Sequence, residues 1–235
     1  MKLLYGADPE LFVYNHVGSW DGEYVSAHDL IPGTKECPHP VQYGAIQVDG
    51  VAAEFNIWPA ANCNDFVRNI LGVKDFLSRE VKKKLPNADV FADPTARFSP
   101  RYFDALPPEV KTLGCTPDFD AYTGEENEPP FTSEPFRTGG GHLHIGWTQD
   151  VDPFDFKHFQ LCRDLTKRLD EVVYEASLDW DEDEERRTLY GRGCFRPKPY
   201  GLEYRPISNA WVSEEQLIER VFYLVDGTTR RFFNV

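Results

Sequence analysis

The sequence predicts an α+β fold with a mostly antiparallel sheet flanked by helices. Segments that alternate polar and apolar residues, as strands do, are mixed along the chain with segments of helical periodicity, and no regular βαβ rhythm connects them. Aromatic residues make up 14% of the chain, which favours strands and turn-rich β structure over a helix bundle. The 235 residues suit one domain, so we expect a single domain over residues 1–235.

The expected strands are short and separated by turn-forming residues. Residues 11–14 and those just before them predict the first strand, after the turn-prone Gly6. Residues 18–44 are rich in Gly, Pro, His and Asp and indicate loops and hairpins. Residues 93–137 indicate a long irregular segment, of the kind that often serves as a lid or binding loop. Further strands are expected within residues 45–57, 138–147 and 201–207.

Three segments have helical periodicity. They cover residues 64–85, 155–178 and about 213–233. In the first, apolar residues recur at helical spacing, and Asn62 or Asn64 is expected to cap the N-terminus. In the last, Ser213 is the expected cap, since Gln216 stands three positions further on, as in a capping box.

The charge of the chain limits its partners. The formal net charge is −14, so the protein would be repelled by phosphate backbones, and non-specific binding to nucleic acid is not expected. An acidic chain also suits a protein that gathers divalent cations, although solubility explains the same charge.

The compartment expected from the sequence is the cytoplasm. No apolar run approaches the ~20 residues needed to cross a bilayer, and the N-terminus has no apolar signal-peptide core. The five cysteines are widely spaced, odd in number and without a CxxC pair, which predicts free thiols in a reducing environment. They stand at positions 37, 63, 115, 162 and 194.

Four of the strand-like segments carry unusual polar residues at alternate positions. The pairs are Asp8 and Glu10, Glu54 and Asn56, His142 and His144, and Glu203 and Arg205. Residues i and i+2 of a strand point to the same face, so each pair shares a face opposite apolar neighbours. Alternation alone indicates only a sheet with one wet face, which is common. The residue types indicate more, because wet faces usually carry Thr, Lys, Ser or Gln.

These residue types point to a metal and a phosphate. Carboxylates gathered on one face repel one another unless cations bind between them, and carboxylates with an imidazole suit Mg²⁺ or Mn²⁺. The guanidinium of Arg205, beside Glu203, suits a phosphate. Glycines 139–141 and Gly146 flank the two histidines, and backbone without side chains lets a ligand approach closely.

These segments resemble a known enzyme family. The matching stretches are GADPELF (6–12), DGVAAEFNIWPA (49–60), RTGGGHLHIG (137–146) and YGRGCFRPKPYGLEYRPISNAW (190–211), and they span nearly the whole chain. In this order they resemble the phage-encoded carboxylate–amine ligases (amidoligases) of type 2, in the superfamily of glutamine synthetase and glutamate–cysteine ligase. The resemblance implies a curved half-barrel sheet that binds ATP and two or three divalent cations, Mg²⁺ or Mn²⁺.

The resemblance also implies roles for single residues. The implied metal ligands are Glu10, Glu54, His142 and Glu203. Arg205 is the implied contact of the transferring phosphate, and Arg192 and Arg196 the arginines that hold the nucleotide or its phosphates. Lys198 stands between two prolines and is either a further phosphate contact or a loop lysine. Asp8 and His144 are the candidates for proton transfer, or they only position a ligand. Asp49 either helps to bind metal or only makes its turn.

The expected function follows from these roles. An ATP-dependent ligase would join a carboxylate to an amine through an acyl phosphate, with small-molecule or peptide substrates, in a host cytoplasm if the chain is phage-encoded. Oligomers are compatible with the sequence. Two alternatives stay open: a metallohydrolase that uses the face of His142 and His144, with Glu54 or Glu203, to hold Zn²⁺, and an inactive phage protein that binds a host factor.

Overall fold

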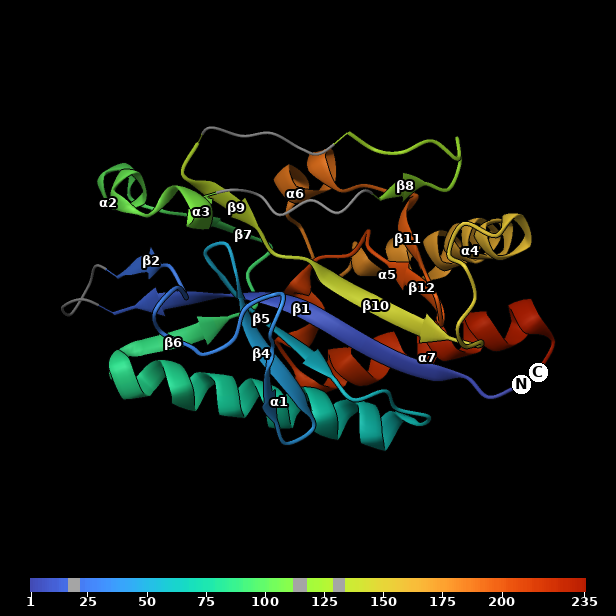
Figure 1. Ribbon diagram of the computed structural model, residues 1–235, viewed down its shortest axis with the longest axis horizontal. Helices are drawn as coiled ribbons and strands as arrows, with labels where there is room; N and C mark the ends of the chain where they lie inside the picture. The colour runs from blue at the N-terminus through green and yellow to red at the C-terminus, as the bar shows by residue number, and fades with distance from the viewer. Residues whose placement is uncertain (17–21, 112–117, 129–133) are drawn as a thin grey trace.

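An open antiparallel sheet of ten strands organises the molecule (Figure 1). The computed structural model describes residues 1–16, 22–111, 118–128 and 134–235. Every strand pairing between described residues is antiparallel, helices flank the sheet, and the sheet does not close into a barrel. The predicted fold class is therefore confirmed.

The strands follow one another across the main sheet in the order β3-β4-β5-β1-β10-β12-β11-β8, with β2 and β6 both paired to β1. A separate two-stranded sheet joins β7 and β9. The bounds are β1 (Leu4–Asn15), β2 (Glu23–Val25), β3 (His39–Val41), β4 (Gly44–Asp49), β5 (Ala52–Ile57), β6 (Ala88–Phe91), β7 (Thr95–Arg97), β8 (Phe119–Asp120), β9 (Phe136–Thr138), β10 (Gly141–Gly146), β11 (Cys194–Lys198) and β12 (Gly201–Tyr204).

Helices connect and cover these strands. They are α1 (Cys63–Lys84), α2 (Pro100–Ala105), α3 (Pro108–Lys111), α4 (Phe156–Leu169), the π-helix η1 (Asp170–Tyr174), α5 (Glu175–Ser177), α6 (Glu184–Leu189), the 3₁₀ turn η2 (Asn209–Val212) and α7 (Glu215–Phe233). Among the described residues, no helix combines the length and apolar character needed to cross a membrane.

One face of the sheet carries the main hydrophobic core. Side chains at alternate positions of the central strands pack there against α1, α4 and α7. From the strands these are Leu11, Phe55, Leu143, Ile145, Leu202 and Tyr204, and from the helices they include Phe66, Ile70, Leu165, Val221 and Phe222. Because strand side chains alternate, the intervening residues face the other way, where the chain has placed its carboxylates, histidines and arginines.

The predicted helices form with small changes at their ends. Asn62 caps α1, since its side chain accepts a hydrogen bond from the Asp65 N–H, which decides between the two predicted caps. The predicted cap of the last helix is wrong: α7 starts after Glu214, with no side-chain capping bond. Ser213 already has helical dihedrals at the end of η2, whereas an N-cap needs a non-helical conformation.

Two stretches contain more structure than the sequence predicts. No helix or strand is expected from the sequence in residues 186–200, yet these residues form most of α6 and the whole of β11. Residues 93–137 contain β7, α2, α3, β8 and β9, while their portions 112–117 and 129–133 lie outside the described residues. The four cysteines within the described residues are free thiols, as predicted, and Cys115 lies outside them.

Candidate functional site

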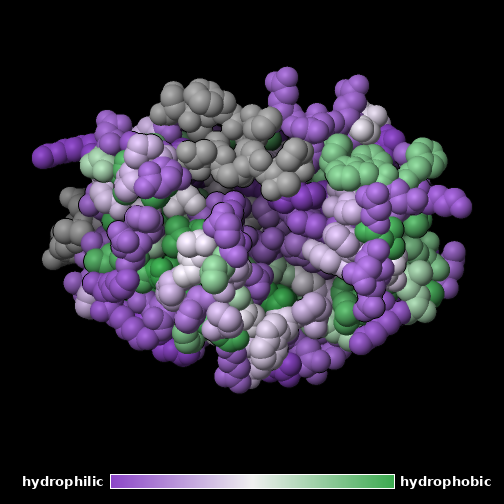
Figure 2. Space-filling view, in the orientation of Figure 1, coloured by the Kyte–Doolittle hydropathy of each residue, from purple (hydrophilic) through white to green (hydrophobic). Residues whose placement is uncertain are grey.

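The four polar segments lie side by side in the sheet. Strands β5, β1, β10 and β12 are direct neighbours in that order. In the register between them, Asp8 is opposite His142, His144 is opposite Glu203, and Glu10 is opposite Glu54. Residues directly opposite in an antiparallel pair have their side chains on the same face. Distant parts of the chain thus contribute to one polar face, and Figure 2 shows a hollow bordered largely by hydrophilic residues in the middle of the molecule.

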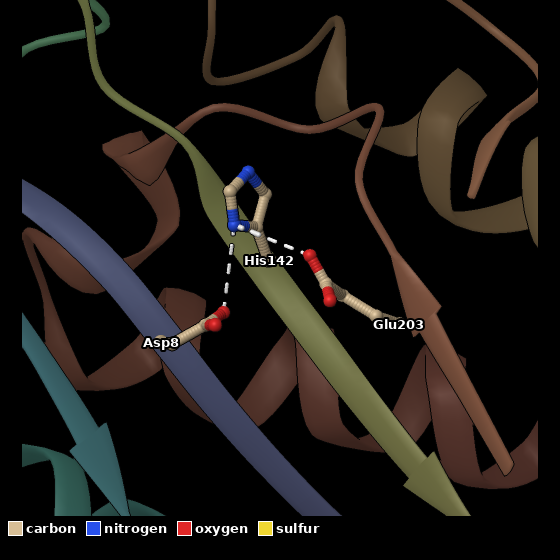
Figure 3. A group of neighbouring side chains, drawn as sticks. All are labelled: Asp8, His142 and Glu203. Carbon is tan, nitrogen blue, oxygen red and sulfur yellow. Dashed lines mark ion pairs between the residues drawn. The ribbon is translucent and has the colours of Figure 1, made fainter. Parts of the chain in front are cut away.

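Asp8, His142 and Glu203 form a compact group at the centre of this face (Figure 3). One ligand atom from each lies within 4.8 Å of the others. The Nδ1 of His142 is 3.5 Å from Asp8 Oδ1 and 3.9 Å from Glu203 Oε1. The side chains come from three adjacent strands, β1, β10 and β12, and those of His142 and Glu203 are buried.

The donor set fits a divalent cation. Asp8 Oδ1 is buried and accepts no hydrogen bond from the described residues, although His144 Nε2 lies 3.0 Å away as an ion pair. Burial raises the pKa of the Asp8 carboxyl, but the charge of His144 and the contacts of both imidazoles outweigh it and hold that pKa well below its usual range. Two carboxylates and one imidazole are ligands of Mg²⁺ or Mn²⁺.

Cations surround Glu203. Arg196 Nη1 lies 2.9 Å from its Oε1, Lys198 Nζ lies 2.6 Å from its Oε2, and Arg205 Nη1 also contacts Oε1. Burial by itself raises the pKa of the Glu203 carboxyl, but the charges of Arg205, His144 and Lys198 prevail and hold the pKa well below its usual range. The guanidinium and ammonium groups gathered at Glu203 suit a phosphate.

A carboxylate from outside the predicted motifs orients Arg205. The Nε of Arg205 donates to Asp118 Oδ2 at 2.9 Å, and the other Asp118 oxygen accepts from the Asn127 amide at 3.0 Å. Asp118 precedes β8, which reaches the site only because β8 pairs with β11. Nothing in the local sequence indicates this role, since Asp118 stands in a segment without periodicity.

The predicted metal ligands divide into two groups. His142 and Glu203 join Asp8, whereas Glu10 lies opposite Glu54 one step further along the face. Glu10 Oε2 accepts from the Gly140 N–H at 2.8 Å, and Glu54 Oε2 accepts from the Gln47 amide at 2.8 Å. Burial, followed by the charges of Asp8, Asp49 and Glu10, raises the pKa of Glu54 well above its usual value. This second group is therefore an acidic cluster, with Lys35 as a nearby cation.

Other predicted residues lie at different places. Arg192 is not at the cluster: it pairs with Glu175 at the surface and its guanidinium lies 5.0 Å from the Tyr174 ring centre. His144 lies on the polar face, where its Nδ1 bonds to the Tyr200 hydroxyl, a partner that sequence patterns did not single out. Asp49 accepts an ion pair from Lys35 Nζ at 2.7 Å.

Two cavities adjoin the Asp8–His142–Glu203 group. A large one of about 770 Å³ is lined by Asp8, Asn56, His144, Trp147 and Tyr200, among others. A small one of about 60 Å³ is lined by Glu10, Gly140, His142, Arg186 and Arg205, among others. Asp8 and His142 sit opposite one another in the sheet and face different cavities, so the group stands at the boundary between them.

Comparisons with family models, with curated proteins and with solved structures find no match for this chain. The resemblance to carboxylate–amine ligases therefore stays a prediction from the sequence segments.

Proposed function

We propose that the protein is an ATP-dependent carboxylate–amine ligase that uses Mg²⁺ or Mn²⁺. The observation that carries this proposal is the Asp8–His142–Glu203 group with Arg196, Lys198 and Arg205 around it. Metal ligands and phosphate-binding cations meet there at the boundary between a large and a small cavity, which is the arrangement that transfer of a phosphoryl group between two substrates requires.

Asp8, His142 and Glu203 would hold one divalent cation. Glu10, Glu54 and Asp49 are suited to a second, because each adds negative charge to the others. When bound, such cations neutralise the charge of the polyphosphate and of the phosphoryl group in transfer.

The large cavity is the proposed nucleotide site. Its volume lies in the range of ligand pockets, roughly 300–1,000 Å³. Trp147, Ile57 and Pro59 give it an apolar wall against which a base can pack. His144 and Asp8 line this cavity, and Asp8 belongs to the same group as Glu203, which pairs with Lys198 and the arginines. The phosphates of a bound nucleotide would therefore point toward the Asp8–His142–Glu203 group.

In the proposed reaction the protein mainly positions the substrate carboxylate, ATP and the amine. An oxygen of the substrate carboxylate attacks the γ-phosphorus of ATP, the bond to the β,γ-bridging oxygen breaks, and ADP leaves. Arg205, held in place by Asp118, donates to the phosphoryl oxygens. The amine then attacks the acyl carbon of the acyl phosphate, and inorganic phosphate leaves. Asp8 belongs to the ligand group. Burial lowers the pKa of the His144 imidazole, but the charges of Asp8 and Glu203 raise it overall, so a protonated His144 would contact the phosphoryl oxygens and not accept the amine proton.

The geometry does not favour the zinc hydrolase. That alternative needs His142 and His144 on one ion, yet within the described parts of the chain the ligand group contains His142 and not His144. The arginines and the lysine at Glu203 suit a phosphate better than a zinc-bound water.

Release of ADP tests the proposal. Wild-type protein with Mg²⁺ and ATP is expected to release ADP only when a carboxylate and an amine from a panel of amino acids, polyamines and peptides are both present. Arg205→Lys keeps the positive charge but cannot donate two parallel hydrogen bonds as a guanidinium does. We therefore expect kcat to fall about 100-fold or more. The control is Glu185→Gln, at an exposed residue that pairs with Arg97.

Two outcomes would contradict the ligase. One is the absence of both Mg²⁺–ATP binding and ADP release, which would favour an inactive binding protein. The other is equal ADP release by wild type and Arg205→Lys. Hydrolysis with Zn²⁺ alone would favour the metallohydrolase.

A further inference from the structure

Two buried arginines at the small cavity have no assigned role. Arg137 precedes β10 and Arg186 lies in α6, and both line the cavity together with Arg205. Arg186 is 1% exposed and Arg137 6%. Arg186 donates to the main-chain carbonyls of Gly139, Arg205 and Pro206, and the hydrogen bonds that Arg137 makes to described residues likewise go to main-chain carbonyls.

Within the described parts of the chain, neither guanidinium has a counter-charge at contact distance, and the charges of Glu10 and Asp181 act on Arg186 only from further away. Among the described residues, no carboxylate lies within 4.0 Å of Arg137 or Arg186, whereas Arg205 has both Asp118 and Glu203. Burial lowers the pKa of both unpaired arginines, which reflects the cost of holding their charge away from water. An anion in the cavity would offset that cost.

The carboxylates on the cavity wall are already engaged. Glu10 accepts the Gly140 N–H, and Asp49 pairs with Lys35. In the proposed enzyme both would also face a cation. A ligand in the small cavity would therefore meet the positive charge of the arginines.

The size and the remaining wall restrict the anion. The volume of about 60 Å³ is small beside the roughly 300–1,000 Å³ of ligand pockets, so the cavity suits the carboxylate end of a substrate and not a whole nucleotide. Phe12, Val51 and Ala52 form an apolar side of the cavity. A planar carboxylate also matches the fork of a guanidinium.

We infer that the small cavity is the subsite for the carboxylate of the acid substrate, presented on a slender, unbranched aliphatic stem, with Arg137 and Arg186 as its binding residues. The stem would lie along Phe12, Val51 and Ala52. The inference rests on the proposed function for the statement that this carboxylate is the one that reacts; the binding of the anion itself does not depend on it.

Binding of small anions to the full chain tests the inference without turnover. The probes are butyrate, pivalate, which has the same charge but a branched α-carbon, and inorganic phosphate, each titrated into ¹⁵N-labelled protein with Mg²⁺ present. We expect butyrate to shift the amide signals of residues at the small cavity, such as Gly140, and to bind about tenfold or more tightly than pivalate or phosphate.

Variants locate the site. Arg137→Lys and Arg186→Lys keep the charge but lose the fork, so each is expected to weaken butyrate binding about tenfold or more. Arg168→Lys is the control, since Arg168 is exposed on α4 and pairs with Glu171. If Arg186→Lys fails to fold, Arg137→Lys and the comparison of butyrate with pivalate still decide.

Three results would overturn the inference: unchanged butyrate affinity in Arg137→Lys, equal affinity for pivalate and butyrate, or phosphate binding more tightly than butyrate. These results are separate from the fate of the ligase proposal. Selective butyrate binding without any ADP release would support the anion subsite and contradict the ligase proposal. ADP release without selective butyrate binding would support the ligase proposal and contradict the anion subsite.

Discussion

The position of the His142 ring depends on the absence of a side chain two residues earlier. A Cβ added to Gly140 would lie 2.3 Å from His142 Nε2 and 2.7 Å from Cε1, far inside the contact distance of real atoms. The glycine also donates its N–H to Glu10 and accepts from the Glu10 N–H through its carbonyl. Gly140 therefore positions both the imidazole of His142, a candidate metal ligand, and the carboxylate of Glu10.

We predict that Gly140→Ala displaces the imidazole and weakens binding of Mn²⁺ by about 10-fold to 100-fold, which is the range for disturbed support of a metal ligand. Gly146→Ala at the end of the same strand is the matched control, because its added Cβ would meet nothing closer than 3.6 Å. Calorimetric titration with Mn²⁺ measures both. Equal affinities of the two variants would show that His142 is not a ligand.

Behind the site, the π-helix η1 links the helical layer to the strands that carry Glu203 and Arg196. Its Asp170 is fully buried and accepts from the Tyr204 hydroxyl at 2.8 Å, the Tyr122 hydroxyl at 3.0 Å and the Gly193 N–H at 2.8 Å. Tyr204 follows Glu203 in β12, and Gly193 precedes β11. This element therefore anchors both strands from the core side, and π-turns inside helices are often found at functional sites.

Burial raises the pKa of Asp170 even though the hydrogen bonds from Tyr204, Tyr122 and Gly193 lower it. Above the ordinary aspartate value of about 3.9, the unfolded chain has lost a proton that the folded protein still holds. Stability from this group is thus present below that pH and is lost as pH rises through the raised pKa. We predict that the unfolding free energy of wild type falls with pH relative to that of Asp170→Asn in this window, by about 1.4 kcal/mol per unit of raised pKa.

Urea unfolding from pH 4 to 7 measures this difference. Absolute stability is not the readout, because asparagine cannot accept all three hydrogen bonds and the variant is expected to be less stable throughout. Asp164→Asn, on an exposed residue of α4, is the control and should follow wild type at every pH. Parallel curves for wild type and Asp170→Asn would refute the prediction.

Across the whole molecule, the polar face concentrates opposed charges that the fold must hold together. Arg196, Lys198 and Arg205 surround Glu203 at one end, and Glu10, Glu54 and Asp49 gather at the other, with Lys35 paired to Asp49. These charges come from several strands and loops, so their mutual repulsion acts on the entire sheet. A cation bound between the carboxylates would therefore stabilise the complete fold and not one element alone.

We predict that Mn²⁺ or Mg²⁺ raises the melting temperature in a concentration-dependent manner, with about 2.7 kcal/mol of stabilisation at a metal concentration 100 times the dissociation constant. Chelation should reverse the shift. Asp8→Asn removes one ligand charge and should reduce the shift, whereas Asp164→Asn should leave it unchanged. Scanning calorimetry gives the values, and an equal shift in Asp8→Asn would exclude the Asp8–His142–Glu203 group as the site.

Local periodicity is sufficient to predict much of this molecule. The alternation of Leu143 and Ile145 with His142 and His144 predicts a strand with one buried and one polar face, and the helical spacing of apolar residues after Asn62 predicts α1. It is not sufficient for β11, a strand between β12 and β8, because Pro197 and two charged residues interrupt the alternation typical of a strand. Nor does it predict the burial of Arg186, which directly follows five acidic residues, 181–185.

The sequence by itself determined the α+β class and the residue pairs that share a strand face, because both depend on the period of 2 or 3.6 along a single segment. Only the tertiary structure decided which strands are neighbours, and with them the partners of each side chain. It grouped Asp8, and not Glu10, with His142 and Glu203, gave Asp118 to Arg205, and left Arg192 at the surface. The physical reason is that long-range packing sets the register and the strand order. Charged residues that are far apart in the sequence, such as Asp118 and Arg205, form no local pattern from which this packing could be predicted.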